Sequence, residues 1–199
     1  MENKVMLCLL VILHVSPVFS GEKEFEELGK TNACVKCDLT NSQLVKADLK
    51  KANLQGAVLI DANFEGAKLN QANLSEASLL YANLKEADLT GANLSKANLM
   101  DAILIKITLK NADLTGANMY FVNLANANLS GANLTGAFIS ESNLVGVNFS
   151  GANLTKVDFR RAFLTNADLS SAILDGADFT GAKWTDGRIS GKNSIGVCK

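Results

Sequence analysis

Residues 82–96 read ANLKE-ADLTG-ANLSK, three pentapeptides with Ala at the first place and Leu at the third. The pattern continues in both directions, because an apolar residue occupies every position ending in 4 or 9 from Leu39 to Trp184. These are thirty consecutive pentapeptides, of which twenty-three have Leu at the third place and twenty-three have Ala at the first. The consensus is A-[ND]-L-[ST]-x, and its period of five is the main structural signal of the chain.

A five-residue period excludes both a continuous helix and a flat strand. Five residues advance an α-helix by about 500°, so successive Leu side chains would not form a stripe. On a straight strand, an odd period would send them to opposite faces. The pattern is satisfied if each pentapeptide is a short extended piece followed by a turn, with its first and third side chains pointing inward. The chain is therefore predicted to coil as a solenoid.

The consensus resembles that of the pentapeptide-repeat family, and the match covers residues 37–186. The resemblance implies an all-β fold, a right-handed quadrilateral β-helix with four pentapeptides per coil. Members of the family do many things, so the resemblance implies no single function. A core of Leu and Ala leaves no room for a ligand, so we expect function on the outer walls, at the ends or in the tails. Replacing Leu94 by Asp should unfold the middle of the rod.

The remaining residues divide into flanking segments. Residues 1–20 begin with a short polar stretch that holds Lys4 and continue through an apolar core over 5–15 to Val18, Phe19 and Ser20. This predicts a signal peptide cleaved after Ser20; an uncleaved anchor is the alternative. Residues 21–36 predict a cap, with a short helix over 22–29 that lays Phe25 and Leu28 on the first coil, or alternatively a peptide-binding arm. Residues 187–199 predict a C-terminal tail or cap. The mature protein is expected to be secreted or periplasmic, or in an equivalent lumen, without stable membrane insertion.

Three cysteines would remain after signal cleavage. Cys34 and Cys37 both fall at inward-facing places of the repeat, and in an oxidising compartment they are expected to form a disulfide. Buried free thiols, or a redox or metal role, are the alternatives. No second CxxC pair and no mature His completes a zinc site. Cys198 is left over, and we expect it to be free or bonded to another chain.

Composition and charge argue against several classes of function. The chain has 19 Lys and Arg against 20 Asp and Glu, so no nucleic-acid partner is expected. The one His, His14, lies in the predicted signal peptide, and no nucleophile elbow or phosphate loop is present, so we expect no enzyme, cofactor or metal. Asp88 and Asp168 occupy the slot before Leu, where Asn is commoner, and are interpreted as part of the repeat rather than as an acid and base pair.

With four pentapeptides per coil, residues twenty apart stack on one wall. Of the four ladders of residues that follow the third place, three are polar or mixed, and one is apolar in consecutive coils. The candidate interface residues on and beside this wall are Val58, Ile60, Leu80, Tyr81, Met100, Tyr120 and Phe121. Contiguous apolar surface with aromatic side chains is typical of a contact site. A loosely buried shoulder, or cover by a terminal segment, is the alternative; a homodimer and a foreign partner fit equally.

The sequence therefore predicts an exported, non-enzymatic protein-binding or scaffold module. The first alternative is a DNA mimic that protects a type II topoisomerase, as some relatives do. The predicted signal peptide opposes it, and so do the fifteen acidic and twelve basic residues of the repeats, too balanced for a duplex mimic. The second alternative is an ice- or carbohydrate-binding face on one hydroxyl ladder, opposed by the ordinary use of Ser and Thr in turns. That ladder comprises Ser75, Ser95, Thr115, Thr135 and Thr155.

Overall fold

The computed structural model describes residues 22–184. The predicted signal peptide, residues 1–20, and the predicted C-terminal tail with Cys198 lie outside the described residues. Within the described part, no helix is long and apolar enough to cross a membrane.

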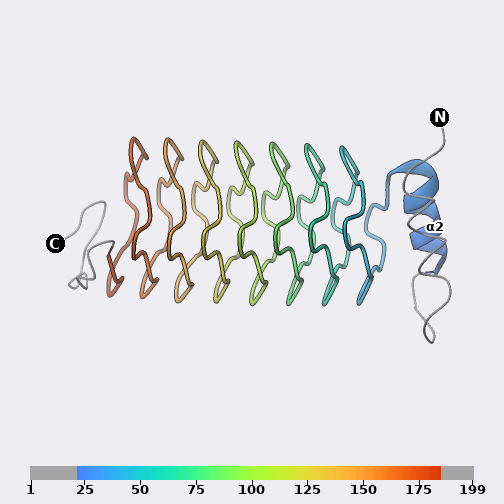
Figure 1. Ribbon diagram of the computed structural model, residues 1–199, viewed down its shortest axis with the longest axis horizontal. Helices are drawn as coiled ribbons and strands as arrows, with labels where there is room; N and C mark the ends of the chain where they lie inside the picture. Colours follow the sequence, from blue (N-terminus) through green and yellow to red (C-terminus); the bar gives the residue numbers. More distant parts are fainter. Residues whose placement is uncertain (1–21, 185–199) are drawn as a thin grey trace.

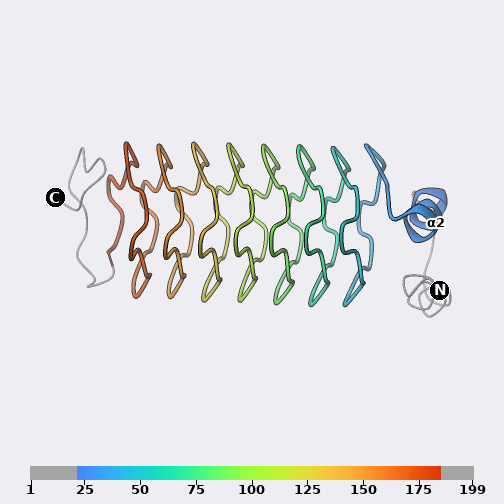
Figure 2. The same cartoon turned by 90° about the horizontal axis from the view of Figure 1, so that it is seen from above.

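The described chain coils into a tube whose turns lie side by side (Figure 1, Figure 2). Parallel β-bridges pair each second-place residue with the residue twenty positions later, from Ala33 with Asn53 to Phe163 with Lys183. Because bridge partners lie twenty residues apart, each coil contains four pentapeptides. The predicted solenoid is confirmed. Its first bridge residue is Ala33, so the regular coil begins four residues before the expected start at Cys37 and includes the end of the segment assigned to the cap.

One pentapeptide, residues 92–96, shows how the pattern produces a coil. Ala92 and Leu94 are both 1% exposed, because the extended piece turns its first and third side chains inward. Lys96, at the fifth place, has a φ of 57°, in the left-handed region. The turn is closed where the N–H of Ala97 donates to the carbonyl of Leu94 at 3.0 Å. A turn after every three extended residues leaves isolated bridges in place of long strands.

Hydrogen bonds between coils hold the tube along its axis. The N–H of Asn93 donates to Ala72 O in the preceding coil at 2.9 Å, and the N–H of Leu94 donates to Asp113 O in the next at 2.7 Å. Ladders of side-chain amides add to these bonds, as where Asn83 Nδ2 donates to Asn63 Oδ1 at 3.1 Å. The backbone polar groups of each coil are therefore satisfied by its neighbours.

The bore of the tube is filled by apolar side chains, and Leu94, Leu114 and Leu134 are each at most 1% exposed. Burial of a Leu side chain contributes roughly 1.5–3 kcal/mol, so this column dominates stability. Towards the C-terminal end the filling becomes aromatic. Phe159 and Phe179, twenty residues apart, stack with ring centroids 4.9 Å apart, and Trp184 lies 4.5 Å from Phe179.

Helix α2 (Glu22–Thr31) lies across the N-terminal end of the tube (Figure 1). Leu28 is 1% exposed and Phe25 packs against the core, so the apolar side of the helix covers the first coil as expected. The helix ends at Thr31, two residues later than the predicted end at Gly29. The prediction was wrong because Gly29 is buried within the helix, and Asn32, with a φ of 57°, takes the left-handed conformation that ends it.

Candidate interaction surface

The four ladders that follow the third place are edges of the tube rather than flat walls. In every pentapeptide whose five residues the structure describes, the fourth and fifth residues form the turn, and every fifth-place residue from Lys36 to Gly181 has a positive φ. The flat faces between edges instead present the second-place residues. The interpretation of the ladders as walls is corrected, because sequence spacing gives the order of stacked residues but not the bend of the backbone between them.

The predicted interface residues gather on one of these edges and beside it. Four of them occupy the fourth place in consecutive coils and are partly buried: Ile60, Leu80, Met100 and Tyr120. Tyr81 and Phe121 occupy the fifth place and are 52% and 49% exposed. Val58 lies on the adjoining face, where it bridges to Ser78. We call the residues of positions 60–61, 80–81, 100–101, 120–121 and 140–141 the apolar edge.

Three further exposed apolar residues flank this edge and were missed by the sequence interpretation. Phe138 is 53% exposed on the face before the edge, and Ile103 and Phe163 are 43% and 50% exposed on the face after it. Each occupies the second place, where Asn or Asp is usual. An apolar residue at a polar slot was the available signal, and Val58 was the one second-place residue that the sequence interpretation included in the interface. Among the described exposed large apolar residues, Val35, Val45 and Ile173 lie away from this region.

The centre of the apolar edge is an aromatic pair beside a shallow hollow. The ring centroids of Tyr120 and Phe121 lie 4.3 Å apart at an interplanar angle of 66°, an edge-to-face contact. The hollow, of about 480 Å³, is lined by Met100, Gly116, Asn118, Tyr120, Phe138, Ser140, Asp158 and Arg160. Such a recess beside exposed rings can accept a side chain from a partner.

The turn that carries Tyr120 and Phe121 differs from its neighbours. In most described turns the N–H after the fifth place donates to the carbonyl of the third place. Here the N–H of Val122 donates to Ser142 Oγ at 3.1 Å, and that hydroxyl donates to Met119 O at 2.9 Å. A buried hydroxyl from the next coil thus bridges the two ends of the turn. It replaces the usual direct bond at the corner where the aromatic pair is presented.

The conformation of the exposed aromatic residues carries a cost. Tyr81 and Phe121 have φ values of 60° and 57°, a region where bulky L-residues are disfavoured by about 1–2 kcal/mol. Ten of the corresponding positions in other turns are Gly, and the remaining ones are mainly Lys, Glu, Asp and Asn. Large rings at two positions of one edge are therefore unfavourable for the fold alone.

Charged groups end the apolar edge on its C-terminal side. Arg160 donates to Asp158 through Nε and Nη2, both at 2.8 Å, and Arg161 donates to Glu141 at 3.2 Å. Burial acts to raise the pKa of Asp158, but its hydrogen bonds from Arg160 outweigh burial and hold the pKa below the ordinary value. Burial, reinforced by the nearby Glu141 carboxylate, raises the pKa of Tyr120. The phenol is thus kept neutral and the two arginines are paired.

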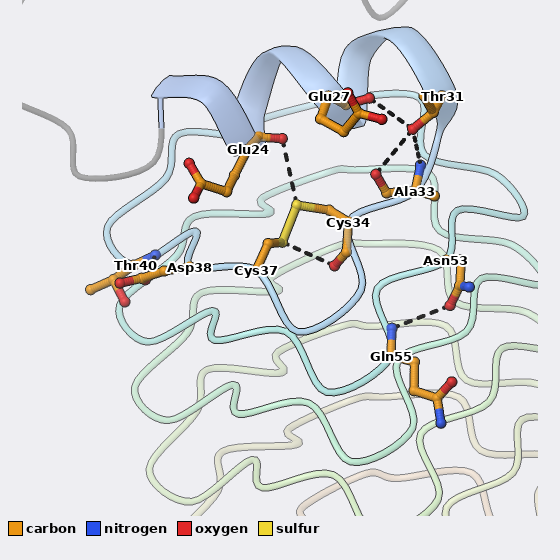
Figure 3. The surroundings of a disulfide bond; sticks show 10 residues. All are labelled: Glu24, Glu27, Thr31, Ala33, Cys34, Cys37, Asp38, Thr40, Asn53 and Gln55. Atoms are coloured by element: carbon orange, nitrogen blue, oxygen red, sulfur yellow. Dashed lines mark hydrogen bonds between the residues drawn. A yellow bond between two sulfur atoms is a disulfide. The ribbon is translucent and has the colours of Figure 1, made fainter.

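The predicted disulfide pair lies beneath α2, where the structure joins Cys34 to Cys37 (Figure 3). Cys34 is 5% exposed, Cys37 is partly buried, and Cys34 Sγ lies 3.5 Å from Glu24 O of the helix. In this first turn the sulfur–sulfur bond stands where later turns have a backbone hydrogen bond. A second hollow, of about 560 Å³, is lined by Lys23, Glu24, Glu27, Thr31, Ala33, Cys34, Val35 and Cys37.

The hydroxyl ladder and the repeat carboxylates have local structural partners. Thr135 Oγ1 donates to Asn133 Oδ1 at 2.7 Å, and the same oxygen accepts the N–H of Thr135. Asp88 accepts the N–H of Thr90 at 3.0 Å and its hydroxyl at 2.7 Å. These hydroxyls therefore bond the side chain two residues earlier in the chain. Between residues 22 and 184 no group of three or more His, Cys, Asp or Glu could hold a metal ion.

A family model described as pentapeptide repeats matches the chain with eight copies between residues 37 and 183. The matched segments are 37–75, 67–104, 92–131, 112–151, 123–161 and 148–183. The comparison with curated proteins gives no match.

Solved structures of the same repeat class resemble the chain. HetL, a pentapeptide repeat protein involved in heterocyst differentiation regulation in the cyanobacterium Nostoc sp., is 32% identical and has a TM-score of 0.28; the match covers 79% of this chain and 89% of HetL. QnrB1, a plasmid-mediated fluoroquinolone resistance protein, is 14% identical and has a TM-score of 0.45; the match covers 77% of this chain and 87% of QnrB1. A pentapeptide repeat protein from the Arabidopsis thaliana thylakoid lumen is 29% identical and has a TM-score of 0.20; the match covers 74% of this chain and 78% of that protein.

Proposed function

The chain belongs to the pentapeptide-repeat family, and we propose that it is a non-enzymatic protein-binding or scaffold module that contacts its partner through the apolar edge. The observation that carries this proposal is the gathering of exposed Tyr81, Ile103, Phe121, Phe138 and Phe163 around one edge. A tube filled with Leu and Ala leaves only its outside for recognition, and clustered exposed aromatic residues are typical of contact sites.

Two features make the gathering unfavourable for the free protein and so support a role in binding. Because Tyr81 and Phe121 are each about half exposed, they contribute little hydrophobic stabilisation to the fold. Both residues also adopt a disfavoured φ. The opposite edge has small or polar residues at the same places, among them Thr90, Gly91, Asn111 and Ser130. The fold therefore does not require aromatic residues at such a corner.

The remaining parts of the proposal concern the whole chain. We infer that the coil is right-handed and four-sided, as in the family, with α2 as the N-terminal cap and residues 187–199 as the C-terminal one. Residues 1–20 are proposed to be a signal peptide, so that the mature protein acts in a secreted, periplasmic or equivalent lumenal compartment. Export fits the disulfide between Cys34 and Cys37, because such bonds persist in oxidising compartments.

Photo-crosslinking tests the proposal even while the partner is unidentified. A photoreactive phenylalanine analogue replaces Phe121, and in a matched control it replaces Asn111, which occupies the same place and has a similar φ of 56° on the opposite edge. We expect a discrete crosslinked species, identified by mass spectrometry, from position 121 and not from position 111. Identical products from both positions, or none at position 121 in extracts of every compartment, would refute the proposed edge.

A further inference from the structure

We propose that the apolar edge, as the contact surface described above, is built for one kind of partner: an amphipathic α-helix with basic residues one heptad apart. This inference rests on the proposed function and names the chemistry of the partner. The order and spacing of the side chains along the edge support it, and so do the carboxylates of Asp61 and Asp101, which have no hydrogen bond or ion pair among residues 22–184.

Acidic and aromatic residues alternate along the fifth place of the apolar edge. Successive coils present Asp61, Tyr81, Asp101, Phe121 and Glu141. Glu141 is held by Arg161 at 3.2 Å. Asp61 and Asp101 are exposed, and their carboxylates have no hydrogen bond or ion pair within residues 22–184. The edge therefore offers two free carboxylates, each next to an exposed ring.

The charge of these groups decides between partners. A partner with basic residues gains an ion pair at each free carboxylate, whereas a second copy docked about its own Met100 would bring Asp101 close to Asp101. An anionic bilayer would repel the same carboxylates.

The spacing of the coils matches the heptad repeat of an α-helix. Neighbouring coils lie about 4.8 Å apart, so Asp61 and Asp101, two coils apart, are separated by about 10 Å along the tube. On an α-helix, residues seven apart lie on one stripe and are about 10.5 Å apart. Same-face residues of a strand repeat every 6.6–6.8 Å or so and do not match. A helix that runs along the edge can thus place basic residues at both carboxylates.

Apolar residues of the same helix would meet the rings. Residues three and four positions after the first basic residue face the same side of the helix, midway between the two basic residues. That position along the edge is occupied by Tyr81, and the corresponding position one heptad further on is occupied by Phe121. The hollow lined by Met100, Tyr120 and Phe138 lies beside this path and can receive a longer apolar side chain.

The test uses the full mature chain and two labelled synthetic helices of about 16 residues. One carries Lys at heptad spacing with Leu between, and the other carries Glu in place of Lys. Binding is measured by fluorescence anisotropy against wild type, Asp61→Lys/Asp101→Lys and the control Glu76→Lys, which changes an exposed acidic residue on another edge. A scrambled Lys peptide of the same composition controls for net charge.

We expect the Lys helix to bind wild type and Glu76→Lys alike, and the double variant to bind it about three- to tenfold more weakly, as two exposed ion pairs would give. The Glu helix should show the reverse preference and bind the double variant better than wild type. Equal binding of the scrambled peptide, or loss of affinity in Glu76→Lys equal to that in the double variant, would overturn the inference. So would binding to vesicles of phosphatidylcholine and phosphatidylglycerol without binding to either peptide.

Failure of this inference is distinguishable from failure of the proposed function. If the photoreactive analogue at position 121 crosslinks to the same protein equally well with and without the Asp61→Lys/Asp101→Lys substitutions, the edge is a contact site, but its carboxylates do not bind basic residues of the partner. If crosslinking at position 121 fails as well, both proposals fall.

Discussion

For single residues, the left-handed backbone conformation of the fifth place determines which side chains each turn accommodates without strain. Gly136 has a φ of 67°, and a Cβ built there would meet nothing within 4 Å, so the effect of a side chain at this position is purely conformational. Gly136→Ala is expected to destabilise the protein by about 1 kcal/mol. Phe121→Gly should be neutral or stabilising by up to about 1 kcal/mol, although it removes an exposed ring. Urea unfolding of both variants checks this, and a large destabilisation by Phe121→Gly would mean that the ring serves the fold.

Two buried serines at the first place, where Ala is usual, are expected to behave oppositely. Ser42 Oγ is buried without a hydrogen-bond partner among the described residues, so Ser42→Ala should raise the free energy of unfolding by about 1 kcal/mol. Ser142 Oγ bridges Val122 N–H and Met119 O, so Ser142→Ala should lower it by about 1–3 kcal/mol. Thermal unfolding should show a higher Tm for Ser42→Ala and a lower Tm for Ser142→Ala. The same change of Tm in both variants would contradict the hydrogen-bonded bridge through Ser142 Oγ.

The carboxylate of Asp88, at the second place of its pentapeptide, predicts that the fold loses stability in acid. Burial acts to raise the pKa of Asp88, but hydrogen bonds from Thr90 outweigh it and the pKa lies below its ordinary value. A folded pKa below the unfolded one means that the ionised group stabilises the fold above about pH 4 and that this contribution is lost as the pH falls through the folded value. Asp88→Asn, which places the commoner repeat residue there, should lose less Tm between pH 7 and pH 3 than wild type. An unchanged acid limb would remove Asp88 from the explanation.

At the scale of elements, α2 and the first coil form one unit. The helix contributes Leu28 to the core, and the disulfide joins the two ends of the first turn directly beneath the helix (Figure 3). The end of a solenoid exposes unpaired backbone groups, so such a cover opposes association between tubes. The helix itself could be predicted from Phe25 and Leu28, but its end could not, because Gly29 reads as a stop while it is in fact buried in the helix.

Removing the anchor of α2 should therefore affect one end of the tube only. Leu28→Ala is expected to cost about 2–5 kcal/mol locally, since Leu28 is 1% exposed. Hydrogen exchange should show faster exchange at the amides of Cys34 and Leu39 and unchanged protection at Leu94. The control Glu27→Ala changes an exposed residue of the same helix. Uniform loss of protection along the tube would contradict the separate unit.

For the molecule as a whole, the five-residue period predicted the solenoid and its core, and the family resemblance supplied the four pentapeptides per coil. An inward Leu every five residues admits no other regular arrangement, and Leu94, Leu114 and Leu134 are accordingly buried. The candidate site was predicted in part. Stacking of positions twenty apart located the aromatic residues of one edge, but the bend of the turns is not encoded in that spacing. Phe138 was missed although an apolar residue at a polar second place was the signal for it. Bridging by Ser142 could not be predicted, because Ser at the first place also occurs at Ser42 without such a bond.

We propose that recognition takes place on one edge of the tube, and spin labels on opposite edges test this. Nitroxide labels on Phe121→Cys and Asn111→Cys, each in a Cys198→Ser background, report on opposite edges of the same coils. Electron paramagnetic resonance spectra are recorded before and after addition of the purified partner that the crosslinking experiment identified. We predict line broadening at position 121 and an unchanged spectrum at position 111. Broadening only at position 111, or equally at both, would contradict the claim.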